Sequence, residues 1–350
     1  MYEYLNYLII LFIRKGWCFV KKVFLLLISI MLLTGCGSVN KENLIENFKD
    51  DVESAKSYYL EAKMEIFNSE DTFVYNMKVY YMDDDYFKVN MVNTINNHEQ
   101  IILRDAESVY VVTPSLNKSY KFMSEWPYNS SQAYILNSLI KDINNDSEIE
   151  FETGDDEYVL KVDVNYPNNS YLKYEKMIFD KNKKLSTVLV YDKDDVVCIK
   201  VNFSKIDFKA NLSEDDFDVS NISVFNKTEI ESSSLDDIIY PLYIPSNTYL
   251  HDKETVNTEN GKRVILTFNG DKNFVLIEEE TSLSDEFMTI PVYGDPLMLS
   301  NTIGALSSNS LSWTSNNVDY YLASSDLSTE ELLTIADSLN LNNTTVYYEK

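Results

Sequence analysis

Residues 158–165 read Tyr158-Val159-Leu160-Lys161-Val162-Asp163-Val164-Asn165, with apolar side chains at every second position from Tyr158 to Val164. Successive side chains of a strand point to opposite faces, so this stretch predicts a strand with one buried and one wet face. The same period continues on both sides, and we predict strands at 59–68, 72–82, 86–95, 99–105, 108–113, 117–123, 148–153, 157–165, 171–179, 185–192 and 196–208. Evenly spaced strands with acidic turns between them indicate one strongly curved antiparallel sheet.

The last of these segments contains a change of phase. Its apolar positions are Val197, Ile199, Val201 and Phe203, followed by Ile206 and Phe208. An extra residue between Phe203 and Ile206 would move the apolar side chains from odd to even positions without turning the buried face outward. The pattern therefore predicts a β-bulge.

Two segments have the period of a helix instead. Residues 41–57 place Leu44, Ile45, Phe48, Val52 and Ala55 on one face, and residues 130–143 do the same with Ala133, Leu136, Leu139, Ile140 and Ile143. Apolar residues at this spacing predict two amphipathic helices, each able to cover an apolar surface. Pro127 and the Ser130-Ser131 pair precede the second segment and suggest its start.

The predicted order of elements is helix, strands, helix and strands, and the strands include a local motif. It runs Leu103-Arg104-Asp105-Ala106-Glu107-Ser108-Val109-Tyr110-Val111-Val112-Thr113-Pro114 and is followed by Asn117-Lys118-Ser119-Tyr120. Over residues 41–220 the chain resembles the LolA/LolB-like lipoprotein-localisation family, in which this motif is a strand, an Asp-Gly turn and an aromatic strand. Ala106 stands where the family has the turn glycine. The resemblance implies an open antiparallel β-barrel, with helices as a lid over its concave apolar face.

A second folding unit is predicted after a polar stretch at 211–236, which is rich in Asp, Ser and Asn and is typical of a linker. Strands are expected at 262–268 and 273–280, joined by Asn269-Gly270-Asp271-Lys272, and near 303–307, 310–314 and 318–324. A helix at 327–339 would begin with a capping box formed by Ser328 and Glu331. This unit resembles a small α+β module found at the C-terminus of Firmicutes lipoproteins. The predicted fold class is thus α+β, with an open-barrel domain at 36–210 and a small domain at 237–350.

The first 36 residues predict export. Lys21 and Lys22 precede an apolar run from Val23 to Leu33, which is too short to span a bilayer comfortably. The sequence then reads Leu33-Thr34-Gly35-Cys36, which resembles a bacterial lipobox. The resemblance implies a lipoprotein signal segment at 1–35, removed before maturation, and a Cys36 that carries acyl chains such as palmitate. The true start could be Val20, with residues 1–19 upstream of it, or these residues could be a real extension.

Composition excludes several classes of function. The 350-residue chain has 30 basic and 56 acidic side chains, a net charge of −26 that would repel nucleic acid. Its 8 glycines form no phosphate-binding loop, and its 2 histidines allow no histidine-rich metal site. After removal of the signal segment and acylation of Cys36, Cys198 is the remaining free cysteine, so no internal disulfide can form.

Candidate catalytic or metal-binding groups have simpler structural interpretations. The Asp192–Asp195 run lacks the rest of a calcium loop and is interpreted as a solvated turn. Glu278–Glu280 is interpreted as a wet strand end, His98 as a surface histidine and Cys198 as a buried structural thiol. Six tyrosines could either pack in the core or line the concave face: Tyr58, Tyr59, Tyr80, Tyr81, Tyr110 and Tyr120. We expect no catalytic residue, no metal and no cofactor.

Two classes of function stay open. LolA-like lipoproteins include the spore-germination family typified by GerS, which supports a cell-wall amidase in modification of the spore cortex. The Asn-, Lys-, Ile- and Tyr-rich composition is typical of clostridia and agrees with this resemblance. It implies a non-enzymatic adaptor on the extracytoplasmic face of the cell membrane or in the forespore or spore envelope, anchored by its acyl chains. The expected partner is a protein, by resemblance the amidase, with a homodimer also open. The alternative is a LolA/RseB-like binder or sensor of a lipid or lipoprotein in envelope signalling.

Overall fold

The computed structural model describes residues 39–68, 71–83, 85–222, 238–259, 261–282 and 286–340. The described residues from Phe48 onward belong to one compact unit. The expected signal segment at 1–35 and the expected lipidation site, Cys36, lie outside the described residues. No helix within the described ranges is long and apolar enough to cross a membrane.

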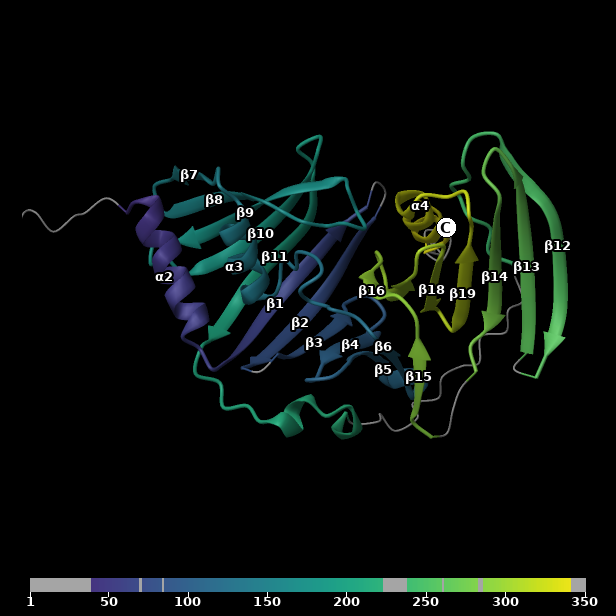
Figure 1. The fold of residues 1–350 in the computed structure, drawn as a ribbon, viewed down its shortest axis with the longest axis horizontal. Helices are drawn as coiled ribbons and strands as arrows, with labels where there is room; N and C mark the ends of the chain where they lie inside the picture. The colour runs from purple at the N-terminus through teal and green to yellow at the C-terminus, as the bar shows by residue number, and fades with distance from the viewer. Residues whose placement is uncertain are drawn as a thin grey trace, which may run out of the picture. The chain divides into compact units, whose positions relative to one another are not determined.

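Twelve strands form the first sheet, in the order β15-β6-β5-β4-β3-β2-β1-β11-β10-β9-β8-β7 (Figure 1). Their bounds are β1 Ser57–Phe67, β2 Thr72–Met82, β3 Tyr86–Asn93, β4 Glu99–Arg104, β5 Val109–Thr113, β6 Lys118–Phe122, β7 Glu150–Thr153, β8 Glu157–Asp163, β9 Leu172–Asp180, β10 Leu185–Asp192, β11 Val197–Asp207 and β15 Met288–Val292. All neighbours pair antiparallel except β15, which runs parallel to β6. The sheet ends in β15 and β7, so it is open, and the predicted α+β class with an open antiparallel sheet is confirmed.

The predicted bulge lies where β11 pairs with β1. The register passes from Glu61 opposite Lys205 to Ala62 opposite Phe203, which leaves Ser204 as the inserted residue. The Ser204 hydroxyl donates to the Glu61 carbonyl over 3.1 Å. The insertion keeps Val201 and Leu60 on the same buried face despite the change of phase.

Two helices contact that buried face, α2 (Lys41–Glu53) and α3 (Leu136–Asn145). The ring of Phe48 in α2 lies edge-on to Phe179, with centroids 5.3 Å apart. From α3, Asn137 Oδ1 accepts the hydroxyl of Tyr58 over 3.0 Å. The expected lid of helices over the concave face is therefore present.

The second helix begins later than the predicted residue 130. The Ser131 N–H donates to the Asn165 carbonyl over 2.7 Å, and the Ser131 hydroxyl accepts the Asn165 N–H over 2.8 Å. The same hydroxyl donates to Asp142 over 2.8 Å. Ser131 is thus bound to the segment after β8 and to the body of α3, whereas Ile135 stands at the N-cap, and residues 130–135 lie outside the helix.

The opposite face of the first sheet has its own apolar cluster. Ile101, Leu103, Tyr110 and Val112 surround Phe217, which is 1% exposed. Phe217 ends the short helix η2 (Glu214–Phe217), and two similar turns are η1 (Pro114–Leu116) and η3 (Val219–Asn221). The first part of the stretch predicted as a linker thus packs on the sheet.

The second sheet contains seven strands in the order β12-β13-β14-β19-β18-β17-β16. Their bounds are β12 Thr248–Thr258, β13 Gly261–Gly270, β14 Phe274–Glu280, β16 Asp295–Met298, β17 Ile303–Leu306, β18 Ser310–Ser315 and β19 Val318–Ala323, and the helix α4 is Thr329–Asn340. The predicted hairpin at 269–272 joins β13 to β14. Residues Leu332, Ile335, Ala336 and Leu339 of α4 belong to the core cluster of this sheet. The predicted capping box is present, because Glu331 accepts the Ser328 N–H over 2.8 Å and Ser328 accepts the Glu331 N–H over 3.2 Å.

Residues that are far apart in the sequence form contacts that join the two sheets. Besides the β15–β6 pairing, Tyr75 donates its hydroxyl to the Ser300 carbonyl over 2.9 Å. Gln100 accepts the Ile303 N–H over 2.9 Å, and both of these hydrogen bonds are buried. The division into domains at 36–210 and 237–350 stays a prediction.

Candidate functional site

A cavity of about 620 Å³ opens between one end of the first sheet and α4. Its size lies within the range of about 300–1,000 Å³ that is common for small-molecule sites. It is lined mainly by apolar and uncharged side chains, namely Ile66, Phe67, Asn68, Ile102, Trp126, Ser130, Gln132, Tyr134, Tyr166, Asn169, Tyr171, Leu172, Cys198, Ile199, Leu242, Tyr243, Pro296, Leu297, Met298, Leu299, Ser300, Ile303, Leu333, Thr334 and Ser338, together with Asp192, Glu330 and Asp337. This arrangement can hold an apolar molecule and offer it a few polar contacts.

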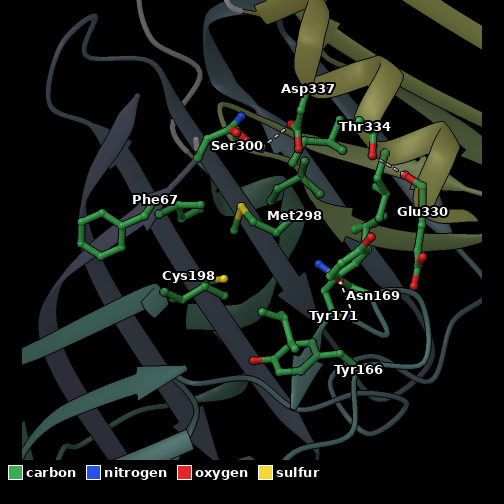
Figure 2. A pocket seen from close by; sticks show the side chains of 18 of the residues that line it. Phe67, Tyr166, Asn169, Tyr171, Cys198, Met298, Ser300, Glu330, Thr334 and Asp337 are labelled. Atoms are coloured by element: carbon green, nitrogen blue, oxygen red, sulfur yellow. Dashed lines mark hydrogen bonds between the residues drawn. The ribbon is translucent and has the colours of Figure 1, made fainter. Parts of the chain in front are cut away.

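Helix α4 forms one wall of the cavity, because one of its faces packs in the core of the second sheet and another faces the cavity. Leu333 and Thr334 each lie three or four residues from both Glu330 and Asp337, and all four line the cavity, as Figure 2 shows for Glu330, Thr334 and Asp337. The Thr334 hydroxyl donates to the Glu330 carbonyl over 2.8 Å, and Asp337 Oδ1 accepts the Ser300 N–H over 3.0 Å. Loss of water contact raises the pKa of Asp337 above its usual value, and the Ser300 N–H opposes that shift.

The ends of β1 and β11 form the facing wall. Ile66 lies opposite Ile199 in the register of these strands, and both line the cavity with their neighbours Phe67 and Cys198 (Figure 2). Cys198 was expected in the core, but it is half-buried at the cavity. Burial, with the charge of Asp192, raises the pKa of its thiol. The thiol is therefore protonated at neutral pH, the state least suited to nucleophilic attack.

Two buried acids that interact electrostatically with the lining residue Tyr166, Glu175 and Asp142, were not found from the sequence. Glu175 in β9 is 0% exposed, and neither of its carboxylate oxygens has a hydrogen-bond partner among the described residues. Burial, reinforced by the charge of Asp142, raises the pKa of Glu175 well above its usual value. Burial also raises the pKa of Asp142 to about 6. Glu175 lies in phase with Met177 and Phe179 on the buried face, where the neutral form of its carboxyl is favoured over the carboxylate.

The predicted acidic turn is a hydrogen-bonded turn in the structure. The Asp192 carboxylate accepts the N–H groups of Asp194 and Val196, each over 2.8 Å. Such side-chain to backbone bonds are typical of an Asx turn. Nowhere in the described ranges do three His, Cys, Asp or Glu side chains come together as a metal site.

The interpretation of Glu278–Glu280 as a wet strand end is wrong for Glu278. This residue is 0% exposed, because it lies opposite Val264 and Tyr320, whose side chains belong to the core of the second sheet. Its Oε2 accepts the Ile239 N–H over 3.2 Å, and burial raises the pKa of its carboxyl to about 7. Glu279 instead faces Arg263, with 2.7 Å between carboxylate and guanidinium.

The two histidines lie in different parts of the fold. His98 is half-buried immediately before β4, and burial lowers the pKa of its imidazole. His251 is exposed in β12. The structure does not bring either one into the cavity lining.

The six candidate tyrosines are divided between the two faces of the first sheet and its junction with the second. Tyr58 and Tyr81 stack at 4.9 Å, and Tyr59 pairs with Tyr80 at 4.9 Å on the opposite face. Tyr110 belongs to the Phe217 cluster, and the Tyr120 hydroxyl lies 3.3 Å from that of Thr314. These tyrosines pack within the protein, and the cavity is lined by Tyr134, Tyr166, Tyr171 and Tyr243 instead.

Three solved structures have distant likenesses to this chain. A chain of the Clostridioides difficile CwlD amidase–GerS lipoprotein complex is 15% identical over 51% of this chain and 98% of that one, with a TM-score of 0.30. The LolA superfamily protein NE2245 from Nitrosomonas europaea is 12% identical over 52% and 99%, with a TM-score of 0.31. A chain of the Pseudomonas aeruginosa MucA/MucB complex is 9% identical over 84% and 96%, with a TM-score of 0.29. At such low scores these likenesses do not bear on function.

Sequence similarity is much closer. The profile of the family described as sporulation protein YdcC-like matches residues 17–217. The sporulation protein YdcC of Bacillus subtilis (strain 168) is 35% identical over 329 residues, which cover 91% of this chain and 97% of that protein. The expected connection with sporulation is confirmed by this match, and the chain belongs to the YdcC-like family of sporulation proteins.

Proposed function

We propose that this protein is a non-enzymatic adaptor that holds a protein partner at the extracytoplasmic face of a membrane during sporulation. The observation that carries the proposal is the edge strand β12. Among the strands that the structure describes, its eleven residues pair with β13 alone, and every side chain between its two ends is exposed. An unpaired strand edge offers backbone donors and acceptors to an extended segment of another protein.

The side chains of β12 favour pairing with a specific partner strand rather than with any exposed strand. Tyr249, Leu250 and Val256 are exposed by 62%, 38% and 37% and could contact apolar side chains of an added strand. The register with β13 shifts between Leu250 and Asp252, and Asp252-Lys253-Glu254 gives the edge alternating charges. Bulges and charges of this kind restrict which strands can pair. A second copy of the chain is one candidate for the added strand.

Acylation of Cys36 would supply the membrane anchor. Cys36 ends the lipobox-like tetrapeptide 33–36, after a basic pair and an apolar run. Two or more acyl chains hold a protein stably at a bilayer, whereas a single chain binds marginally. By the resemblance of the sequence to GerS-like lipoproteins, the partner we propose is a cell-wall amidase that acts on the spore cortex.

The absence of a catalytic role is tested by substitution. We would replace His98, His251, Asp194, Glu279 and Cys198 one at a time and score spore formation and germination in a strain that lacks the gene. All five variants should complement, because an adaptor depends on a surface rather than on one reacting group. Complete loss of function in any variant that is still folded and membrane-bound would favour an enzyme or a metal site.

The cavity supports a second candidate function, the binding of an apolar ligand such as an acyl chain. Its volume of about 620 Å³ and its largely apolar lining are the supporting observations. The fluorescence of the uncharged probe N-phenyl-1-naphthylamine increases in apolar surroundings, so it would report binding in the cavity. A Leu333→Gln variant, which places an amide in the α4 wall, should weaken binding at least fivefold. Equal binding by the variant and the original chain would contradict this second function.

A further inference from the structure

Each charged side chain in the cavity lining is acidic. Asp192 comes from the end of β10, and Glu330 and Asp337 come from α4, while no Lys, Arg or His is among the described lining residues. We infer that the cavity accepts an acyl-type amphiphile whose head is uncharged or cationic, and rejects the same chain with an anionic head. This inference rests on the second candidate function, ligand binding in the cavity.

The three acidic side chains accept hydrogen bonds from uncharged donors. Asp337 accepts the Ser300 backbone N–H over 3.0 Å, and Glu330 accepts the Ser170 hydroxyl. Asp192 accepts the N–H groups of Asp194 and Val196. Hydrogen bonds from neutral donors favour the ionised form of a carboxyl group without cancelling its charge, and at Asp337 the Ser300 N–H opposes the rise in pKa that burial causes. The cavity therefore has a negative potential that these contacts leave in place.

The positions of the acids spread this potential along the cavity. Glu330 and Asp337 are seven residues apart on one face of α4, which separates them by about 10 Å along the helix axis. Asp192 lies on a different element, as the last residue of β10. An anionic head would lose its water on entry and approach at least one carboxylate wherever it came to rest. Both effects oppose binding more strongly in apolar surroundings than in water.

The remaining polar lining groups suit an uncharged head. Ser130, Gln132, Asn169 and Thr334 offer hydroxyl and amide groups at the cavity. Such groups can both donate to and accept from an alcohol or an ester without a charge of their own. The apolar chain would lie against residues such as Phe67, Leu172 and Met298. The lining thus provides contacts for both ends of a neutral amphiphile.

Competition between matched ligands tests the inference. N-phenyl-1-naphthylamine would be bound at pH 8 to the mature chain carrying Cys36→Ala, which keeps every described residue. Dodecanol below its solubility limit, and dodecylamine and dodecanoate below their micelle concentrations, would then compete. We expect dodecanol and dodecylamine to displace the probe at concentrations at least tenfold lower than dodecanoate. Displacement by dodecanoate within threefold of dodecanol would overturn the inference. Failure of the neutral probe to bind would refute the ligand-binding function itself, which is a different result.

Two double variants with the same change in net charge test whether the acids of the cavity cause the exclusion of the anionic ligand. The double variant Glu330→Gln/Asp337→Asn should bind dodecanoate at least fivefold better, with little change for dodecanol. The control Glu107→Gln/Glu259→Gln removes two exposed acids outside the lining and should keep the original preference. An equal gain in both variants would mean that the net charge of the protein, rather than the cavity, excludes anions, and would overturn the inference.

Free lipids and lipidated proteins can share the uncharged acyl esters that fit this cavity. Monododecanoylglycerol represents the free lipid, and a diacylglyceryl-cysteine peptide without charged groups represents a lipoprotein terminus. Added as further competitors, they distinguish the two sources. Displacement stronger than that by dodecanoate supports the inference, and the better of the two competitors identifies the source as free lipid or lipoprotein. Weaker displacement by both contradicts the inference.

Discussion

The backbone N–H of Ile239 donates to Oε2 of Glu278 over 3.2 Å, which fixes the segment after the predicted linker to the centre of the second sheet. Ile238 and Ile239 also pack against the core of that sheet. Residues Leu242 and Tyr243, a few positions further on, line the cavity. The buried carboxyl of Glu278 therefore contributes to the placement of the cavity rim.

The first prediction concerns pH and Glu278. Burial raises the pKa of this carboxyl from 4.5 to about 7, so the folded protein holds its proton more tightly than the unfolded chain. The resulting stability is fully present below pH 4.5 and is lost as pH rises through about 7. Glu278→Gln should gain stability relative to the original chain between pH 5 and pH 8, by up to about 3 kcal/mol. Urea unfolding across this range would measure the difference.

The control for this prediction is Glu259→Gln, which changes an exposed acid in the same part of the chain. Its free energy of unfolding should follow that of the original chain at every pH. A difference between Glu278→Gln and the original chain that does not change with pH would show that Glu278 has the same pKa in both states.

Glu175 gives a second prediction on stability. It is fully buried on the apolar face of β9, and no hydrogen-bond partner is found for it in the described part of the chain. Replacing an unsatisfied buried polar group by an apolar one of similar size is commonly stabilising. Glu175→Leu should therefore raise the free energy of unfolding at pH 7 by about 1–3 kcal/mol. Thermal or urea unfolding checks this value.

Lys173→Leu is the matched control, because residue 173 lies on the same strand at an exposed position. Surface substitutions of this kind usually change stability by less than about 0.5 kcal/mol. A loss of stability in Glu175→Leu would mean that the carboxyl has a favourable role in the fold.

The strands of the first sheet could be predicted because their burial follows the sequence period. Residues 158–165 alternate in the sequence, and β8 covers most of that stretch. In contrast, β12 was not predicted, since nearly all its side chains are exposed and no alternation arises. The short strand β15 was also missed, because a parallel pairing between residues about 170 positions apart leaves no local pattern.

The cavity could not be predicted from the sequence for a related reason. Its acids Asp192, Glu330 and Asp337 lie in separate elements, and only the tertiary fold brings them to one space. Glu175 did leave a signal, because a charged residue occupies the same phase as Met177 and Phe179 in an otherwise apolar face. A search for polar residues on the buried phase of a strand would have found it.

A third prediction concerns the anchor. Cys36→Ala should leave a folded protein that no longer fractionates with membranes, because the acyl chains supply the attachment. The net charge of −26 gives the protein no electrostatic attraction to anionic headgroups. Membrane fractionation in high salt, with circular dichroism as a check of folding, measures both properties. A Cys36→Ala protein that stays with the membrane in high salt would mean either that Cys36 is not acylated or that the apolar segment upstream of it is retained as an anchor.

The most direct test of the adaptor proposal is photo-crosslinking in sporulating cells from the edge strand β12. The crosslinking amino acid p-benzoylphenylalanine would replace Tyr249, which is 62% exposed on that edge, or Tyr321, which is 45% exposed on the internally paired strand β19. The proposal predicts a crosslink from position 249 to one protein, identified by mass spectrometry as a cell-wall amidase, and little or none from position 321. Equal crosslinking from both positions, or none from position 249 while the protein is folded and membrane-bound, would contradict it.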